Sequence, residues 1–327
     1  MINFQYVRTS IVKTALSLIN KDPKATFIAG GTNLVDLMKR GVTAPEKLID
    51  INHLPLKKIE LVNNVLQIGA LTANSAVAEN ALVKEKFPLL MLALQSGASA
   101  QLRNVATVGG NMMQRTRCGY FYDITMPCNK REPGSGCGAI GGYNRMHAIF
   151  GTSESCIAVH PSDMCVGLVA LDAKVVIAGS KGERRINFID FHRLAGNTPE
   201  KDNNLQKGEL IMRVDIPTNN LNKNFHYLKV RDRSSYAFAL VAVAAALDLK
   251  DGKINDVRLA MGGVAHKPWR LTAAEAFLKG KEATKANFEA AAQLAMKDAK
   301  GYGENDFKLK LAPNTIVEAL TVAKAKA

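Results

Sequence analysis

The sequence lacks any apolar run that could cross a membrane, since none approaches the roughly 20 residues that a bilayer requires. It also lacks a charged N-terminal segment followed by an apolar core, which is the pattern of a secretory signal peptide. Hydrophobic residues form 47% and charged residues 22% of the 327 residues, as is ordinary for globular proteins. We therefore expect a globular chain that is cytoplasmic, or that leaves the cytoplasm with a partner carrying the export signal.

Hydrolase signatures are absent as well. The sequence contains no G-x-S-x-G motif, and its six histidines form no H-E-x-x-H motif. Acidic charge is also scarce, because 29 Asp and Glu residues against 43 Lys and Arg residues leave a net charge of +14. The basic residues are scattered and do not interleave with aromatic residues. An acidic cofactor and a charged subunit interface explain this excess better than nucleic acid does.

Cysteine is sparse but concentrated in one region. The chain has five cysteines, an odd number that excludes complete pairing in internal disulfides. Four of them lie within 39 residues, spaced C-x9-C-x8-C-x18-C without the C-x2-C pairs of most zinc sites. Long spacings suit an iron–sulfur cluster, whose thiolate ligands converge from a loop. Disulfides and unrelated buried thiols are the alternatives. The four are Cys118, Cys128, Cys137 and Cys156.

The fifth cysteine, Cys165, lies in the apolar run 164–168, which predicts a buried and inert thiol. His147 and His160 flank the cysteine region and are alternative ligands. Nearby basic side chains would favour thiolates and offset the negative charge of a cluster. These basic residues are Arg115, Arg117, Lys130 and Arg131.

Two glycine pairs predict phosphate binding. Gly30-Gly31-Thr32-Asn33 separates an apolar strand, 25–29, from a helical pattern, and Gly109-Gly110-Asn111 follows a second apolar run. Glycine lets a phosphate approach the backbone N–H groups closely. An ordinary tight turn between strand and helix is the alternative. The literal G-x-G-x-x-G match at 136–141 is set aside, because no strand precedes it.

The pattern of apolar residues predicts an α+β chain. Residues 23–51 suggest a βαβ unit, Asn63-Asn64 suggests a hairpin turn, and 115–160 shows no regular period. The polar stretch 201–207 is expected to be a surface loop. Further helices are predicted at 74–80, 88–96 and 164–171, strands at 173–178, 185–189, 209–216, 226–231, 237–249 and 257–262, and three final helices at 272–279, 285–298 and 313–325.

These motifs resemble the FAD-binding subunit of the xanthine dehydrogenase, or molybdenum hydroxylase, family. The resemblance rests on the segments 27–34 (FIAGGTNL), 107–111 (TVGGN), 161–163 (PSD), 229–238 (KVRDRSSYAF) and 262–270 (GGVAHKPWR). The cysteine segment 114–137 is its most specific part, because it resembles the few members that carry a [4Fe–4S] cluster there. Those members include bacterial periplasmic aldehyde oxidoreductases and hydroxybenzoyl-CoA reductase.

The resemblance implies a two-part FAD-binding domain followed by a C-terminal domain. Residues 1–55 would form a small βαβ subdomain. Residues 56–222 would form a larger subdomain with a mixed or antiparallel sheet and an iron–sulfur insertion at about 115–160. Residues 223–327 would form an antiparallel sheet with a three-helix bundle, of the CO dehydrogenase flavoprotein type.

The resemblance also assigns site residues, none of them catalytic, because electrons would simply pass through FAD. One segment would wrap the pyrophosphate, a second would line the flavin and its phosphates, Asp163 would hydrogen-bond FAD, and Lys229 would approach the ring. Leu210 or Ile211 would pack on the cofactor. Cys118, Cys128, Cys137 and Cys156 would hold the cluster, with Cys165 as an alternative to Cys156. The pyrophosphate residues are Thr26, Phe27, Ile28, Ala29, Gly30, Gly31, Thr32 and Asn33, and the second set is Thr107, Gly109, Gly110 and Asn111.

The implied partners are a small subunit with two [2Fe–2S] clusters and a large subunit with the molybdenum cofactor. An aldehyde would be oxidised at molybdenum, outside this chain, and electrons would reach FAD and leave for an external acceptor. The complex would be periplasmic by export with a signal-bearing partner, or else cytoplasmic. Two alternatives are a hydroxybenzoyl-CoA reductase-like complex and a structural metal or disulfide scaffold.

Overall fold

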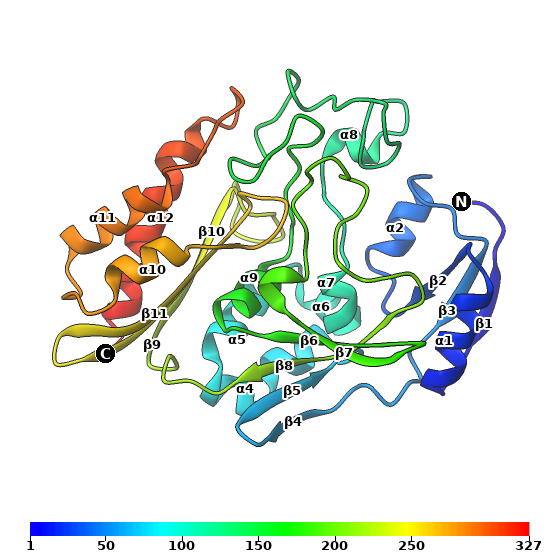
Figure 1. The fold of residues 1–327 in the computed structure, drawn as a ribbon, viewed down its shortest axis with the longest axis horizontal. Coiled ribbons are helices and arrows are strands. Elements are labelled where there is room, and N and C mark those ends of the chain that lie inside the picture. The colour runs from blue at the N-terminus through cyan, green and yellow to red at the C-terminus, as the bar shows by residue number, and fades with distance from the viewer. Residues whose placement is uncertain (327) are drawn as a thin grey trace.

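Three β-sheets organise the chain in a computed structural model that describes residues 1–326 (Figure 1). The N-terminal sheet is parallel, with the order β1-β3-β2. The predicted βαβ unit is present as β2, α2 and β3, but an additional strand and helix precede it. Strand β1 has a weak signal, because its four residues are largely exposed, whereas α1 has apolar residues at helical spacing, including Val12, Ala15 and Ile19, and was simply missed. The elements are β1 (Gln5–Arg8), α1 (Val12–Lys21), β2 (Ala25–Ile28), α2 (Leu34–Lys39) and β3 (Lys47–Asp50).

The second sheet is antiparallel, with five strands in the order β4-β5-β8-β6-β7. The predicted hairpin turn is confirmed, since Asn63 and Asn64 have φ of 50° and 61° between β4 and β5. Apolar residues of this sheet share a core with helices α5 and α9. The strands are β4 (Ile59–Val62), β5 (Val65–Gly69), β6 (Lys174–Gly179), β7 (Gly182–Asn187) and β8 (Leu210–Pro217), and the helical elements are α3 (Asn74–Glu79), α4 (Ala81–Lys86), α5 (Pro88–Ser96), α6 (Ala100–Val105), α7 (Val108–Met112), α8 (Gly119–Tyr122), α9 (Asp163–Ala170) and η1 (Phe188–Asp190).

The third sheet, β12-β11-β10-β9, is antiparallel and buried on both faces. Along β10 the residues alternate: Ala242, Ala244 and Ala246 face the core that contains α5 and α9, whereas Val243 and Leu247 face the C-terminal helices. All three predicted helices are present, although α12 begins at Phe307 and includes Pro313. The elements are β9 (Asn224–Val230), β10 (Val241–Lys250), β11 (Lys253–Gly262), β12 (Trp269–Arg270), α10 (Thr272–Leu278), α11 (Lys285–Ala295) and α12 (Phe307–Lys324).

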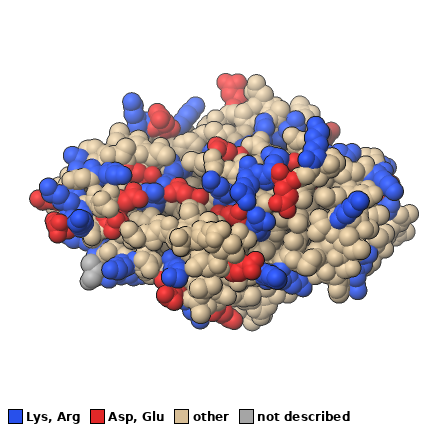
Figure 2. All heavy atoms as spheres, turned by 60° about the horizontal axis from the view of Figure 1, so that its bottom comes forward, with Lys and Arg blue, Asp and Glu red and all other residues tan. Residues whose placement is uncertain are grey.

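The cysteine loop, residues 113–162 between α7 and α9, contains one short helix, α8, and is otherwise irregular, as the sequence predicted. It is fixed by single bridges rather than by strands, including Cys128 to Cys137 within the loop and Phe150 to Ala265 in the C-terminal half. Along residues 1–326, every helix is too short or too polar to span a bilayer. On the face shown in Figure 2, Lys and Arg are interspersed with Asp and Glu and form no continuous basic stripe.

Candidate functional site

The two predicted glycine segments meet at one cavity of about 580 Å³. All of residues 26–33 line this cavity, together with Thr107, Gly109 and Gly110, and Leu210 and Ile211 complete the opposite wall. Its volume lies in the usual range for a small-molecule site, about 300 to 1,000 Å³. The cavity therefore brings together most of the residues that the sequence associated with FAD.

Close backbone contact explains the first glycine pair. A Cβ atom at position 30 would lie 2.1 Å from the carbonyl oxygen of Val105, so only glycine lets the turn after β2 touch the end of α6. Gly31 has φ +71°, a left-handed conformation that other residues rarely adopt. The contact between Gly30 and the Val105 backbone thus requires glycine at position 30, even without a ligand. Gly30 also lines the 580 Å³ cavity.

The second glycine pair differs from the prediction of an open turn. Gly109 and Gly110 lie inside the short helix α7, which Thr107 caps by accepting a hydrogen bond from the Gly110 N–H at 3.2 Å. The Gly109 N–H donates to Ala70 O at 2.8 Å. These two amides are already paired, so they are not free to bind phosphate, and the first pair is the better phosphate candidate.

Asn111, Asp163 and Lys229 lie outside the lining of the 580 Å³ cavity. The Asn111 side chain bonds the Ser162 hydroxyl and so joins α7 to the start of α9. Lys229 donates to Asp163 Oδ2 at 2.8 Å and Tyr227 donates to Oδ1 at 2.8 Å, so both carboxylate oxygens are occupied. Burial beside this carboxylate raises the pKa of Tyr227 well above its usual value.

Asp163 instead lines a second cavity, of about 520 Å³. The walls of this second cavity come from the cysteine loop, from the segment before α9 and from the turns after β9 and β11. They include aromatic residues such as Tyr143 and Phe238. Asp163 therefore belongs to a cavity between the FAD-binding half and the C-terminal half of the chain. Lys229 reaches it only through the ion pair.

The four clustered cysteines surround one small space of about 10 Å³. All are unpaired, so the disulfide alternative is not realised in this conformation. Burial raises the pKa of the Cys118 thiol to about 12 and that of Cys156 to about 11. Cys165 is absent from this lining and lies in α9, packed in the core. The structure thus gathers Cys118, Cys128, Cys137 and Cys156 and leaves Cys165 apart.

The four thiols are suitable ligands for an iron–sulfur cluster, but the space of about 10 Å³ between them is too small to contain one. Four thiols from one loop are the ligands that such a cluster requires, and the Ala158 N–H lies 3.5 Å from Cys156 Sγ. A space of about 10 Å³ holds about one water, so the thiols must move apart to admit a cluster. Irregular loop backbone, which carries few ladder hydrogen bonds, allows such a movement more readily than a sheet would.

The basic residues near the cysteines have partners that the sequence did not reveal. Lys130 donates to Asp202 at 2.5 Å and Arg115 donates to the same carboxylate at 2.7 Å. Arg131 holds the carbonyl oxygens of Tyr120 and Phe121 at 2.8 and 2.9 Å. These cations therefore tie the loop together as well as raising the local positive potential.

Asp202 belongs to the 191–209 loop between η1 and β8, where a polar surface loop was predicted. The surface loop is confirmed, since Gln206 and Lys207 are exposed, but these two residues and Leu205 also line the 580 Å³ cavity. Polarity is typical of both a solvated loop and a loop beside a charged ligand. No signal in the sequence separated these two cases.

Comparison with known proteins identifies the family. Residues 2–219 match the family described as "FAD binding domain in molybdopterin dehydrogenase", and residues 226–323 match "CO dehydrogenase flavoprotein C-terminal domain". The chain belongs to the FAD-binding medium subunits of the molybdenum hydroxylase family. As such a medium subunit, it is the FAD-binding part of an oxidoreductase.

Individual relatives agree along the whole length. The chain is 47% identical over 327 residues to the Escherichia coli aldehyde oxidoreductase FAD-binding subunit PaoB, covering 99% of each chain. It is 29% identical to the glyceraldehyde dehydrogenase medium chain of Sulfolobus acidocaldarius, covering 85% of this chain and 82% of the relative. Among solved structures, a chain of carbon monoxide dehydrogenase from Hydrogenophaga pseudoflava superposes with a TM-score of 0.79 at 26% identity over both full chains. The mixed α+β fold is therefore that of this family.

Proposed function

We propose that this chain is the FAD and [4Fe–4S] electron-transfer subunit of a molybdenum-dependent aldehyde oxidoreductase. The observation that carries most weight is the 47% identity, over both full lengths, to a subunit named for aldehyde oxidation. The four thiols around one space support the cluster, which that identity alone does not establish. FAD, when bound, would supply the carrier that takes up electrons and passes them on.

The residues of this chain would bind and orient the cofactor. The Gly30-Gly31 turn would let the pyrophosphate approach the backbone, and Leu210 and Ile211 would cover it from β8. Asp163, held by Lys229 and Tyr227, would present a fixed carboxylate at the adjoining cavity. The buried ion pair with Lys229 holds this carboxylate in one place, so Asp163 could orient a ligand in the 520 Å³ cavity.

The cluster would be held by Cys118, Cys128, Cys137 and Cys156. Its binding would displace the protons of buried thiols, because only thiolates ligate iron. Lys130, which lies within the same lining, would offset part of the negative charge. The domain divisions at about residues 55 and 222 are part of the same proposal.

The substrate would react elsewhere in the complex. A large subunit with the molybdenum cofactor would oxidise the aldehyde, and a small subunit with two [2Fe–2S] clusters would pass electrons to this chain. An external acceptor would then receive them. Export with a signal-bearing partner would place the complex in the periplasm.

Anaerobic mixing of the purified complex with an aromatic aldehyde tests the function. We expect the flavin absorbance to bleach within the turnover time and to return when an acceptor is added. As a control, the complex is mixed with the carboxylic acid that corresponds to the aldehyde, which should not bleach the flavin. A complex that contains flavin, that the aldehyde does not bleach, and whose chemically reduced flavin is reoxidised by hydroxybenzoyl-CoA would favour the reductase alternative, and a complex without flavin would refute the proposal.

A further inference from the structure

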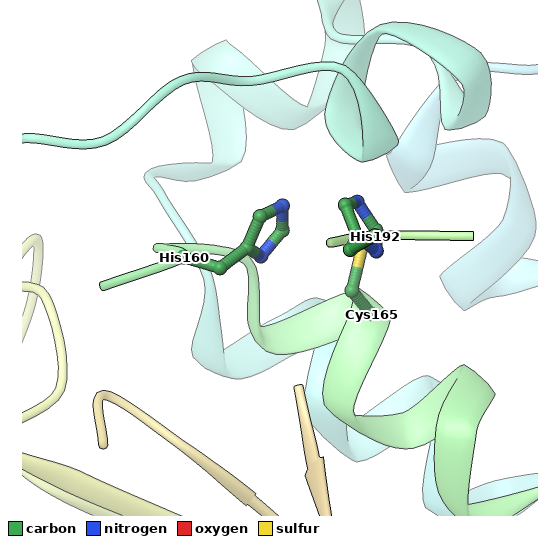
Figure 3. Close-up of side chains that lie close together, drawn as sticks. All are labelled: His160, Cys165 and His192. Carbon is green, nitrogen blue, oxygen red and sulfur yellow. The ribbon is translucent and has the colours of Figure 1, made fainter. Parts of the chain in front are cut away.

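Three metal-ligating side chains lie together outside the cysteine loop's cluster of four. His160 precedes α9, Cys165 lies in the first turn of α9, and His192 follows η1 (Figure 3). One ligand atom from each lies within 4.8 Å of the other two, and all three residues are buried. Residues from two separate segments, 160–165 and the residues after η1, thus converge on one point in the interior.

The ring nitrogens at this point are free to act as ligands. His192 Nε2 lies 2.9 Å from the carbonyl oxygen of Met112, so Nε2 carries the proton and Nδ1 keeps its lone pair. Within residues 1–326, His192 Nδ1 and His160 Nε2 have no hydrogen-bond partner although both are buried. The Ser162 N–H donates a long hydrogen bond of 3.4 Å to His160 Nδ1, and this bond would be lost if His160 bound a cation through Nε2 with the proton on Nδ1. A buried nitrogen without a hydrogen-bond partner requires an explanation, and a bound cation is one that would satisfy both histidines at once.

The electrostatic setting agrees with metal ligation. Both imidazole rings are buried, and burial disfavours the positively charged imidazolium form. Neutral imidazole is the form that binds a metal. A bound cation would also offset the cost of forming a thiolate at Cys165, because opposite charges attract strongly in a buried site.

We propose that His160, Cys165 and His192 bind one thiophilic cation, Cu(I) or Zn(II), at a site separate from the cysteine loop's four thiols. One sulfur and two nitrogen donors without a carboxylate exclude the oxygen-preferring Mg²⁺ and Ca²⁺. Three ligands suit trigonal Cu(I) directly, whereas Zn(II) would take a water as its fourth ligand. The cation has a way in, because His160 lines the 520 Å³ cavity.

The bound cation would join residues 160–165 to the start of the 191–209 loop, in addition to the contacts that Arg115 and Lys130 make with Asp202. His160 continues from the cysteine loop, Cys165 anchors α9, and His192 begins the 191–209 loop that lines the FAD cavity. Anything that binds the folded state alone stabilises it. The cation would therefore fix the positions of α9, the cysteine loop and the 191–209 loop relative to one another. This inference does not depend on the proposed electron transfer.

Metal analysis of the purified complex tests the proposal. The complex is supplied anaerobically with Cu(I) or with Zn(II), passed through a desalting column, and analysed for metals by mass spectrometry. We expect about one equivalent of one of these metals per chain in the wild type, and its loss in Cys165→Ser and in His192→Gln, with iron unchanged. His226→Gln, which alters a half-buried histidine on β9, is the matched control and should retain the metal.

Cobalt substitution gives a readout that does not need a variant to fold. Co(II) bound by Cys165 should give a thiolate-to-cobalt charge-transfer band in the wild type, and Zn(II) should abolish the band by competition. Retention of neither Cu(I) nor Zn(II) by the wild type would overturn the proposal. Equal retention by the Cys165→Ser complex would also overturn it, because it would show an adventitious ion only.

Discussion

Cys156 and Cys165 are near each other in sequence but face different surroundings. Cys156 shares a small space with three other thiols, whereas Cys165 points from α9 towards two histidines. The sequence left open which of the two completes the cluster, because the spacing of the cysteines does not show which thiol faces the other three. The fold separates them by starting a helix at Asp163.

The first prediction exchanges these two residues for serine, one at a time. Cys156→Ser should lower the iron content of the complex by about four atoms per chain, because one ligand of a four-iron cluster is lost. Cys165→Ser should leave iron unchanged and serves as the matched control. Iron is measured per flavin in the purified complex. The opposite result would make Cys165 the ligand.

A second prediction concerns Gly30. The change Gly30→Ala would place a methyl group 2.1 Å from Val105 O, so the turn after β2 must move away from α6. We expect loss of most of the bound FAD, measured as flavin released per chain. Gly280→Ala adds its methyl group in open space at φ +81° and controls for general destabilisation. Equal flavin content in both variants would show that Gly30 has no part in the FAD site.

At the scale of elements, the two irregular loops are joined through Asp202. Its carboxylate accepts from Lys130 of the cysteine loop and from Arg115, which also lines the 580 Å³ cavity. Burial raises the pKa of Asp202, but Lys130 and Arg115 outweigh this effect and hold the pKa at about 2. The carboxylate is thus charged throughout the neutral range.

A third prediction follows from this lowered pKa. A carboxyl group with a pKa of about 2 when folded and about 3.8 when unfolded contributes about 2 kcal/mol of stability above pH 5. That contribution is lost as the pH falls towards 2, because the folded group then becomes protonated. Asp202→Asn should therefore lower the unfolding midpoint at pH 7, and the difference from wild type should shrink below about pH 4. A difference independent of pH would contradict this.

Elements that depend on local residues were predicted from the sequence, whereas elements that depend on distant contacts were not. The hairpin at Asn63-Asn64 and helix α5 follow from turn residues and from an apolar run, and both were predicted. Strand β1 was missed, since its register depends on pairing with β3, far along the chain. Gly109 was predicted in a turn because glycine is typical of turns, yet its N–H is paired with Ala70. Tertiary contacts, not local preference, decided both.

At the scale of the whole molecule, β10 is shared by two cores. Its alanines pack towards α5 and α9 and its larger residues pack towards the C-terminal helices. The sequence predicted a strand at 237–249, but that prediction did not distinguish the small residues of one face from the larger residues of the other. The FAD-binding half therefore packs against the C-terminal sheet, with the β10 alanines beside Tyr227 of β9 and Ala260 of β11 in one shared core.

The fourth prediction tests this shared strand. Ala244→Leu should overpack the space between β10 and the α5–α9 layer and cost about 1–3 kcal/mol, seen as a lower unfolding midpoint. It should also weaken FAD retention, because α9 carries Asp163. Lys250→Leu, at the exposed end of the same strand, is the control and should change neither quantity. Unchanged stability in Ala244→Leu would mean that the two halves are packed loosely.

The Asp202 contact has a consequence for how the protein matures. Arg115 lines the 580 Å³ cavity and Lys130 lines the space between the four cysteines. The Asp202 carboxylate forms an ion pair with both. Filling either site would restrict the loop that forms the wall of the other, so the two cofactors should favour each other's insertion. Chains from flavin-starved cells would then arrive short of iron, and replenishing riboflavin would restore the metal without any change in iron supply.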